Sequence, residues 1–525
     1  MSLNDFLKSN DINYLLYAIY IIKKYFEDND NNEKAIDFLV SQLNCEYMIL
    51  FTSLLNKGDK KISYCLLFIL INIGYTQSGE ELFTLDEKIV LNIAMFLGNN
   101  KNEKTLLYNG IWLIKNISFN DKICEIFLKY KILDFFEEIF ERNLLDSDFM
   151  KNLMSCMKNF INFVIKRHKI KKSKEFLCLL PCIKIIKTQI RPNYSVELLF
   201  SYIYKLYEIA GFNSSDVYYE MINCKIQNEI MNIYPIIVQI IEQLKNNIKK
   251  YEEEYKNQNK NDNIPNDINN INNEEKQKYK KNVKDLETYK QICLVILKIL
   301  GKLMSLDDGI LTQNLLDSGV AIFLTNVIQS HEIRVIKNAA FCISNICAGT
   351  CGQIGNLIKN NTLVELIKVS KNIYDALNYN EKNKNENFSE LKDALREINY
   401  VFSLTIENSI FEKLIPLARF NDYTIVLVLI KGLSLLDDIH DEDLIFNILK
   451  GLYKLIIFDR SEKSDESNNN LDNKNKNILS FTEVMERNGF KETLEKLQMS
   501  ENLKISHQAQ KMYNAVFSNF EEEDN

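Results

Sequence analysis

Aromatic residues followed four positions later by asparagine are the side-chain pairs of this sequence whose types and spacing could do chemistry. Three such pairs stand out within apolar, helix-like stretches: Phe68 with Asn72, Trp112 with Asn116, and Phe341 with Asn345. Residues four positions apart share one face of a helix, so each ring and amide would lie side by side. An amide offers a donor and an acceptor together, and an aromatic ring attracts a cation over its face. The pairs could therefore hold a ligand, although an aromatic residue in an apolar helix more often belongs to the core.

Residues for catalysis or metal binding do not form a recognisable pattern. The sequence has no glycine-rich phosphate loop, no HExxH pair and no nucleophile elbow. The four histidines stand singly, and Cys342, Cys347 and Cys351 lack a fourth ligand at zinc spacing, which favours packing thiols. We therefore expect that the protein is not an enzyme and that it has no cofactor and no metal site.

The asparagines recur at a regular interval. Asn72 and Asn116 are 44 residues apart, Asn159 follows 43 residues later without an aromatic partner, and Lys302 stands 43 residues before Asn345. An interval of about 40 to 47 residues is typical of armadillo or HEAT repeats, whose units stack because none buries its apolar face alone. The sequence therefore predicts an all-α, right-handed armadillo/HEAT-type superhelical solenoid of about nine or ten helical repeats.

Composition supports helices and marks three interruptions. Only 5 prolines and 15 glycines occur in 525 residues, which is too few for the turns that a many-stranded protein would need. Residues 249–285 are rich in Asn and Lys and too poor in apolar side chains to offset chain entropy, and similar tracts lie near 376–390 and 461–477. We expect N-terminal repeats in 1–248, a disordered insert in 249–285, and C-terminal repeats with two smaller inserts in 286–525.

Charge and cysteine usage restrict the partners. The net charge of −7 disfavours nucleic acid as a main partner and is compatible with basic ligands. The 11 cysteines are scattered through apolar runs, which indicates reduced, buried thiols of a cytoplasmic or nuclear protein. No apolar run approaches the roughly 20 residues that span a bilayer, so we expect no membrane partner.

A family resemblance is carried by the C-terminal half. Residues 297–313, with Gly301 and Asp308, and residues 340–354, with Asn345 and Gln353, resemble the sixth and seventh armadillo repeats of importin alpha. Residues 425–433 and 481–498 resemble the last repeats of that family, and the tail 519–525 is similar to its acidic C-terminus. The resemblance implies an adaptor that binds the basic, extended nuclear localisation signals of partner proteins in a concave groove, in nuclear protein import, with residence in cytoplasm and nucleus.

The resemblance also implies site residues. In the family, each signal-binding repeat places a Trp and an Asn one turn later on the concave face, with an acidic wall beside them. Here Trp112 with Asn116 is the intact pair, and Asp121 corresponds to the wall. The other peptide-binding candidates are Phe68, Asn72, Asn159, Phe341 and Asn345. Lys302 replaces an Asn, and a lysine inside a cation-binding groove repels the ligand. Any of these amides could instead bond the backbone of a neighbouring repeat.

The implied partners differ from those of a complete family member. Repeat-like helix is predicted almost from the start of the sequence, at Asn10. The basic segment through which the family binds importin beta does not precede it, so importin beta is a doubtful partner. The last repeats imply the family's export receptor as a partner. The basic run 166–174 is either a solvated loop or a segment similar to a nuclear localisation signal. The alternative function is that of an armadillo-repeat interaction scaffold in a non-import process, without signal recognition.

Overall fold

The structure is a computed structural model, and it shows an all-α protein. It describes residues 12–29, 32–57, 59–142, 147–171, 178–192, 194–261, 273–306, 308–330, 332–383, 388–435, 441–468 and 479–517. Within these ranges every regular element is a helix. The chain divides into two compact units, Met1–Ile190 and Arg191–Asn525, which we call unit 1 and unit 2. Their boundary precedes the Asn-rich segment that we expected to separate two halves.

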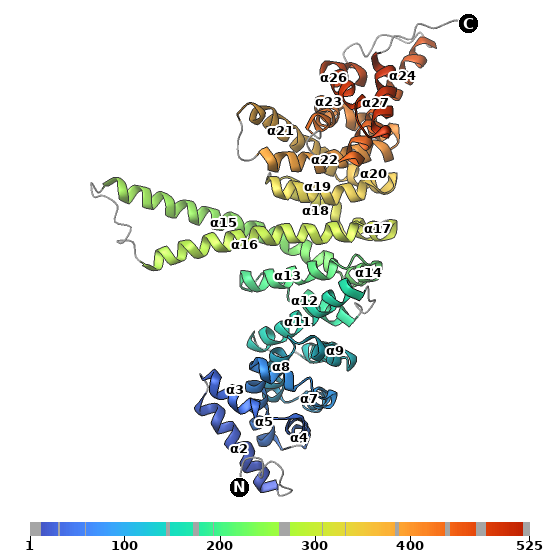
Figure 1. The fold of residues 1–525 in the computed structure, drawn as a ribbon. Coiled ribbons are helices and arrows are strands. Elements are labelled where there is room, and N and C mark those ends of the chain that lie inside the picture. The colour runs from blue at the N-terminus through green and yellow to red at the C-terminus, as the bar shows by residue number, and fades with distance from the viewer. Residues whose placement is uncertain are drawn as a thin grey trace. The chain divides into compact units, whose positions relative to one another are not determined.

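Unit 1 is a stack of short helices, labelled in Figure 1. They are α2 (Ile12–Asp28), α3 (Glu33–Ser41), α4 (Cys45–Leu55), α5 (Lys60–Tyr75), α6 (Gln77–Leu82), α7 (Glu87–Asn99), α8 (Lys104–Ile117), α9 (Asp121–Lys129), α10 (Ile132–Glu141), α11 (Ser147–Lys171) and α12 (Leu180–Thr188).

Unit 2 has the same construction with several longer helices. They are α13 (Val196–Ala210), α14 (Ser215–Asn223), α15 (Ile226–Asn261), α16 (Asn273–Met304), α17 (Gly309–Asp317), α18 (Val320–Ile328), α19 (Ile333–Cys347), α20 (Cys351–Lys359), α21 (Thr362–Asn383), α22 (Phe388–Asn408), α23 (Phe411–Leu435), α24 (Glu442–Asn468), α25 (Phe481–Arg487), α26 (Phe490–Gln498) and α27 (Leu503–Phe517).

One helix of each repeat packs against its counterpart in the next. In unit 1 these helices are α2, α5, α8 and α11, and in unit 2 they are α13, α16, α19, α22, α24 and α27. We call them the ladder helices, and their solvent-facing side is the ladder face. Several hydrogen bonds between successive ladder helices join residues 44 or 45 positions apart. The all-α helical repeat architecture predicted from the asparagine interval is therefore confirmed.

The turn between the first two helices of a repeat has a recurrent backbone conformation. The residue that precedes the second helix is left-handed in several repeats: Lys131, Lys225, Gly319, Asn361 and Gly489 all have positive φ. Glycine adopts this conformation without steric cost, and asparagine tolerates it better than most residues. The two turns predicted from Asp317-Ser-Gly319 and Arg487-Asn-Gly489 are therefore present, and the sequence signal is lost where lysine takes the same position.

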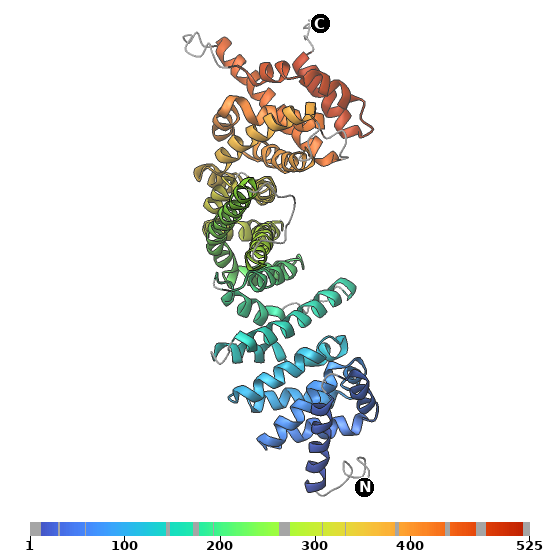
Figure 2. The ribbon, with the colours of Figure 1, turned by 90° about the vertical axis from the view of Figure 1, so that its left-hand side faces the viewer.

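Helices α15 and α16 run side by side (Figures 1 and 2) and extend beyond the helices next to them (Figure 1). Most of the segment predicted to be a disordered insert is therefore helical, since α15 reaches Asn261 and α16 begins at Asn273. The stacked rings of Tyr251 and Tyr279, 4.7 Å between centroids, join the two helices. Pairs four positions apart, such as Lys249 with Glu253, add support along α15. Residues 262–272 lie outside the described ranges.

The two smaller predicted inserts are described only in part, and their described residues are helical. Helix α21 continues to Asn383 and α22 starts at Phe388, while α24 continues to Asn468. The remaining residues, 384–387 and 469–478, lie outside the described part of the chain. Helix α23 is interrupted instead, because Phe420–Tyr423 have non-helical backbone angles and divide it into two arms.

Candidate functional site

The residues predicted to bind a peptide fall in both units. Phe68 and Asn72 are on α5, Trp112 and Asn116 are on α8, and Asn159 is on α11, so these five belong to ladder helices of unit 1. Phe341 and Asn345 are on the ladder helix α19 of unit 2. The ladder helices of unit 1 therefore carry the larger part of the predicted set.

The side chain of Trp112 is the most prominent feature of this face. It is 40% exposed, although it lies on a helix whose Leu113 and Ile114 neighbours are fully buried. Its ring meets the Tyr108 ring edge to face at 6.2 Å, and Tyr108 meets Phe149 of α11 in the same way at 6.1 Å. Trp112 is thus in contact with one ring of its own helix, while a large part of its side chain stays exposed to solvent.

Asparagine side chains bind the backbone of the preceding ladder helix. Nδ2 of Asn116 donates to the carbonyl oxygen of Ile71 at 3.2 Å, and Nδ2 of Asn345 donates to that of Gly301 at 3.1 Å. Nδ2 of Asn159 donates to the Ser118 hydroxyl at 2.8 Å. Each of these amides therefore joins two repeats, which is the structural alternative considered for them from the sequence.

The amides still have hydrogen-bonding capacity. Asn72, Asn116 and Asn345 are half-buried. Among the described residues, no hydrogen bond to Oδ1 of these three side chains is made. An asparagine amide that donates one N–H to a helix carbonyl can still accept a hydrogen bond from a ligand N–H through its Oδ1 atom. Asn159 is buried, so its amide serves the contact between α8 and α11.

Lysine ammonium groups already lie over several rings of the ladder helices, and two of these contacts concern the candidate faces. Nζ of Lys23 on α2 is 5.3 Å from the centroid of Phe68, and Nζ of Lys302 on α16 is 4.3 Å from that of Tyr207 on α13. Both distances are in the range of a cation–π attraction. Trp112 has no such cation among the described side chains. Its free face is therefore open to a cation supplied by a ligand.

Asp121, the predicted acidic wall, is the first residue of α9 and forms an ion pair with Lys166 of α11. Arg167 pairs with Glu125 in the same way, at 2.9 Å. The described start of the basic run 166–174 therefore belongs to α11 and connects it to α9, whereas a loop was one of the two readings from the sequence. The carboxylate of Asp121 is already neutralised by a lysine of its own chain, so its role as a wall stays a prediction.

In unit 2, the Phe341 ring lies directly on the backbone of α16. A Cβ atom at Gly301 would be 2.6 Å from Cε1 of Phe341, so only glycine permits this approach. The ring remains 37% exposed. Tyr207 and the exposed Tyr204 stand on the preceding ladder helix, and their rings lie 5.8 Å apart.

Sequence reasoning missed three aromatic residues of the ladder faces, namely Tyr108, Tyr204 and Tyr207. Tyr108 lies four positions before Trp112, so the spacing that drew attention to Trp112 and Asn116 would also have found it. Tyr204 and Tyr207 lie on α13, which carries no aromatic–asparagine pair in its sequence. Only the three-dimensional position of that helix identifies them.

Groups suited to catalysis or metal binding do not gather in the described ranges. No group of three or more His, Cys, Asp or Glu side chains there could hold a metal ion. Burial raises the pKa of the Cys347 thiol to about 12 and that of Cys293 to about 12, so both stay protonated and unreactive near neutral pH.

No single helix of the described ranges is long and apolar enough to cross a membrane, and Lys34–Ser41 with Cys45–Leu55 meets that test only as a pair bent by 97°.

No protein-family model and no curated protein matches the sequence. Among solved structures, an engineered protein of the Northeast Structural Genomics Consortium, target OR497, matches with a TM-score of 0.55 at 13% identity and covers 98% of both chains. A designed armadillo repeat protein in complex with the peptide (KR)4 matches with a TM-score of 0.37 at 16% identity. A computationally designed armadillo repeat protein for modular peptide recognition matches with a TM-score of 0.39 at 17% identity. Each of these two covers 64% of this chain and 99% of its own. The similarity to target OR497 shows the fold alone. Repeats of three helices, with an interval of 44 or 45 residues, identify that fold as armadillo-type.

Proposed function

We propose that the ladder face of unit 1 binds extended, basic peptide segments of partner proteins. The observation that carries this proposal is the combination at α8 of a half-exposed Trp112 and an Asn116 whose Oδ1 makes no hydrogen bond in the described part of the chain. The ring provides a face for the ammonium or guanidinium group of a ligand side chain, and Oδ1 accepts a backbone N–H of the same ligand. Phe68 and Asn72 have the same spacing one repeat earlier, where a ligand cation would take the place of Lys23 over the ring.

The contact of Lys23 with Phe68 supports a preference for cations. It shows that an ammonium group is accommodated over a ring of this face when the chain itself supplies it. Basic side chains carry long aliphatic stems that can lie along aromatic rings while the charge stays hydrated. An extended basic peptide therefore matches both the rings and the amides of α5 and α8.

The activity that we infer from this binding is that of an importin-alpha-like adaptor in nuclear protein import, present in cytoplasm and nucleus. The ligands would then be nuclear localisation signals. The alternative is a scaffold that binds basic segments in a non-import process. Capture of the importin-alpha export receptor or of importin beta by the immobilised full chain favours the adaptor, whereas peptide binding without either receptor favours the scaffold.

The binding test uses the fluorescence of Trp112, which is the one tryptophan of the chain. Titration with a Lys/Arg-rich peptide is expected to shift and partly quench this emission, because the cation would lie on the indole ring. In the variant Trp112→Leu, affinity measured by anisotropy of a labelled peptide should fall roughly two- to ten-fold, as expected for an exposed cation–π contact. Phe38→Leu is the matched control, because Phe38 is an exposed ring on α3, outside the ladder. Unchanged emission together with unchanged affinity of Trp112→Leu rules the site out.

A further inference from the structure

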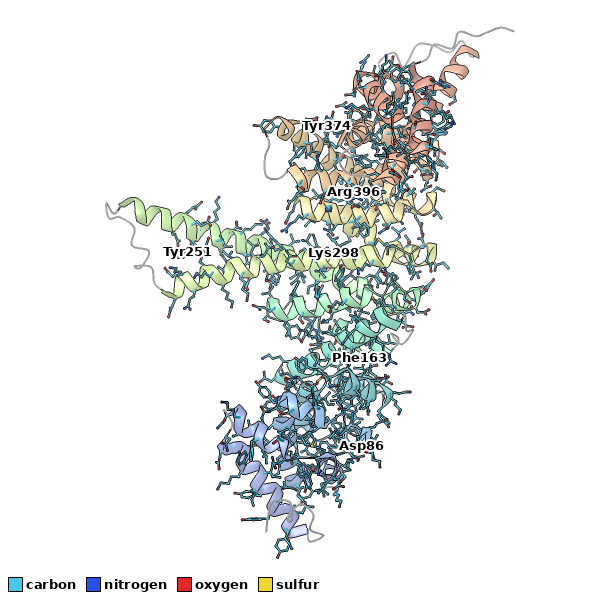
Figure 3. The ribbon with its side chains drawn as sticks, viewed as in Figure 1. Asp86, Phe163, Tyr251, Lys298, Tyr374 and Arg396 are labelled. Atoms are coloured by element: carbon cyan, nitrogen blue, oxygen red, sulfur yellow. The ribbon has the colours of Figure 1, made fainter. Side chains whose placement is uncertain are left out.

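Helix α16 presents two lysines one turn apart on the ladder face of unit 2. Lys298, labelled in Figure 3, is exposed, and Lys302 is half-buried. Among the described residues neither ammonium group has an acidic partner. Burial lowers the pKa of Lys302, and the nearby charge of Lys298 lowers it further, which is the behaviour of a lysine that no carboxylate neutralises.

Charged groups on the neighbouring helices are already paired with one another. Glu208 of α13 forms an ion pair with Lys205, and Glu197 lies 3.3 Å from Lys284. On α19, Nζ of Lys337 lies 2.6 Å from Asp393. The positive charges of Lys298 and Lys302 are therefore not neutralised by these carboxylates. Lys298 is labelled on the part of α16 that lies between α13 and α19 (Figure 3).

A second lysine pair with the same spacing has hydrogen-bond and ion-pair partners within the protein. On α24, Lys450 forms an ion pair with Glu407. Nζ of Lys454 donates to the carbonyl oxygens of Ile406, Glu407 and Ser409 at 2.8, 3.0 and 2.6 Å, at the C-terminal end of α22. There the lysines complete the packing of two ladder helices. Lys302 also lies near the C-terminal end of the preceding ladder helix, over the Tyr207 ring and beside Gly211, but in the described part of the chain it makes no such carbonyl bonds and keeps N–H groups for a ligand.

The side chains around the two lysines suit an extended ligand. Tyr204 and Phe341 are 39% and 37% exposed on the flanking ladder helices. Oδ1 of Asn345 is free of hydrogen bonds within the described ranges, one helical turn from Phe341. The surface thus offers positive charge, aromatic area and a backbone acceptor in one place.

We propose that the ladder face of unit 2 at α13, α16 and α19 binds an extended acidic segment of a partner protein, whose Asp or Glu carboxylates contact Lys298 and Lys302. The charge of these lysines selects the ligand, because a carboxylate gains two ion pairs where a basic side chain would be repelled. The site is independent of the basic-peptide site in unit 1, because α5 and α8 contribute nothing to it. The protein then has two binding faces of opposite charge preference.

The test measures anisotropy of a labelled peptide of alternating Glu and Ala residues on the full chain. The peptide should bind, and the double variant Lys298→Met/Lys302→Met should weaken binding about ten-fold, as expected for two partly exposed ion pairs. The matched control is Lys450→Met/Lys454→Met, which removes the same two charges from the same helical spacing where they are already satisfied. It should change affinity by less than about two-fold. Circular dichroism verifies that both variants remain helical.

Three results overturn the proposal. One is the absence of binding by the Glu/Ala peptide, and another is equal weakening by the two double variants, which would reflect net charge alone. The third is displacement of the peptide by a single-stranded oligonucleotide at much lower concentration, which would identify a phosphate-binding surface. Trp112→Leu should leave acidic-peptide affinity unchanged, so failure of the site in unit 1 and failure of this one are distinguishable.

Discussion

The side-chain amide of Asn116 is bonded to the backbone of Ile71, 45 residues earlier, through a 3.2 Å hydrogen bond from Nδ2 to the carbonyl oxygen. The two residues lie on the successive ladder helices α8 and α5. Asn345 makes the same bond to Gly301 in unit 2. The periodic asparagine therefore contributes to repeat stacking, whatever ligand its other atoms bind.

Removal of the Asn116 amide should lower the stability of unit 1. We expect Asn116→Ala to reduce the free energy of unfolding by about 1 kcal/mol, because the one hydrogen bond from this side chain to the preceding repeat is lost. Urea unfolding followed by circular dichroism measures the change. Asn72→Ala is the control, because Nδ2 of Asn72 bonds Phe68 in its own helix, and it should cost clearly less. Equal costs would show that the inter-repeat bond contributes nothing specific.

The contact between Gly301 and Phe341 predicts a second effect on stability. In Gly301→Ala the new methyl group would be 2.6 Å from the Phe341 ring, so the ring or α19 must shift, at a cost of roughly 1–3 kcal/mol. Gly98→Ala is the matched change, because a Cβ there meets nothing within 4 Å and the helix gains up to about 1 kcal/mol. Thermal unfolding of both variants gives the comparison.

A double-mutant cycle identifies the cause of the Gly301 effect. In a Phe341→Ala background the added methyl group has room, so the further cost of Gly301→Ala should largely disappear. An unchanged cost in that background would assign the effect to the backbone of α16 and contradict the ring contact.

The lowered pKa of Lys302 predicts a pH dependence. Between this lowered value and the ordinary 10.5 of the unfolded chain, the unfolded state binds more protons, so stability due to this group rises with pH. At neutral pH the buried charge is unfavourable, and Lys302→Met should therefore be at least as stable as the parent. The advantage of the variant should shrink as the pH rises from neutral toward 10.5, because the parent lysine deprotonates over this range. Urea unfolding at several pH values measures the stability difference between Lys302→Met and the parent. A difference that grows with pH would contradict the prediction.

The period of the fold was readable from the sequence because one residue type recurs at the same position of several repeats. Asn72, Asn116 and Asn159 report that interval directly, and Gly319 and Gly489 mark two turns. Helix type followed from apolar spacing and few prolines. The exposed position of Trp112 agrees with its prediction as a ligand-facing residue, and its ligand contact stays a prediction.

Other features depend on contacts between distant residues and left no local signal. The bond of Asn116 to Ile71 and the placement of Lys23 over Phe68 exist only once successive repeats have stacked. The same holds for the carbonyl bonds of Lys454 and their absence at Lys302, since each lysine follows another lysine by four positions in the sequence. Low apolar content near 249–285 suggested disorder because the stacking of Tyr251 on Tyr279 cannot be read from either segment alone.

The projecting part of the α15–α16 pair should be dispensable for the rest of unit 2. Fully buried side chains end at Ile241 on α15 and begin again at Ile292 on α16, so the outer parts of both helices pack mainly on each other. Replacing residues 250–284 by a short Gly/Ser linker should change the free energy of unfolding by less than about 1 kcal/mol, because loop closure is inexpensive and the lost Lys284–Glu197 pair is exposed. Circular dichroism should show less helix at an unchanged midpoint of unfolding.

By contrast, Ile296→Ala, within the buried part of α16, should lower the free energy of unfolding by about 2–5 kcal/mol. A lowered midpoint in the shortened chain would mean that the projecting helices stabilise the repeats beside them.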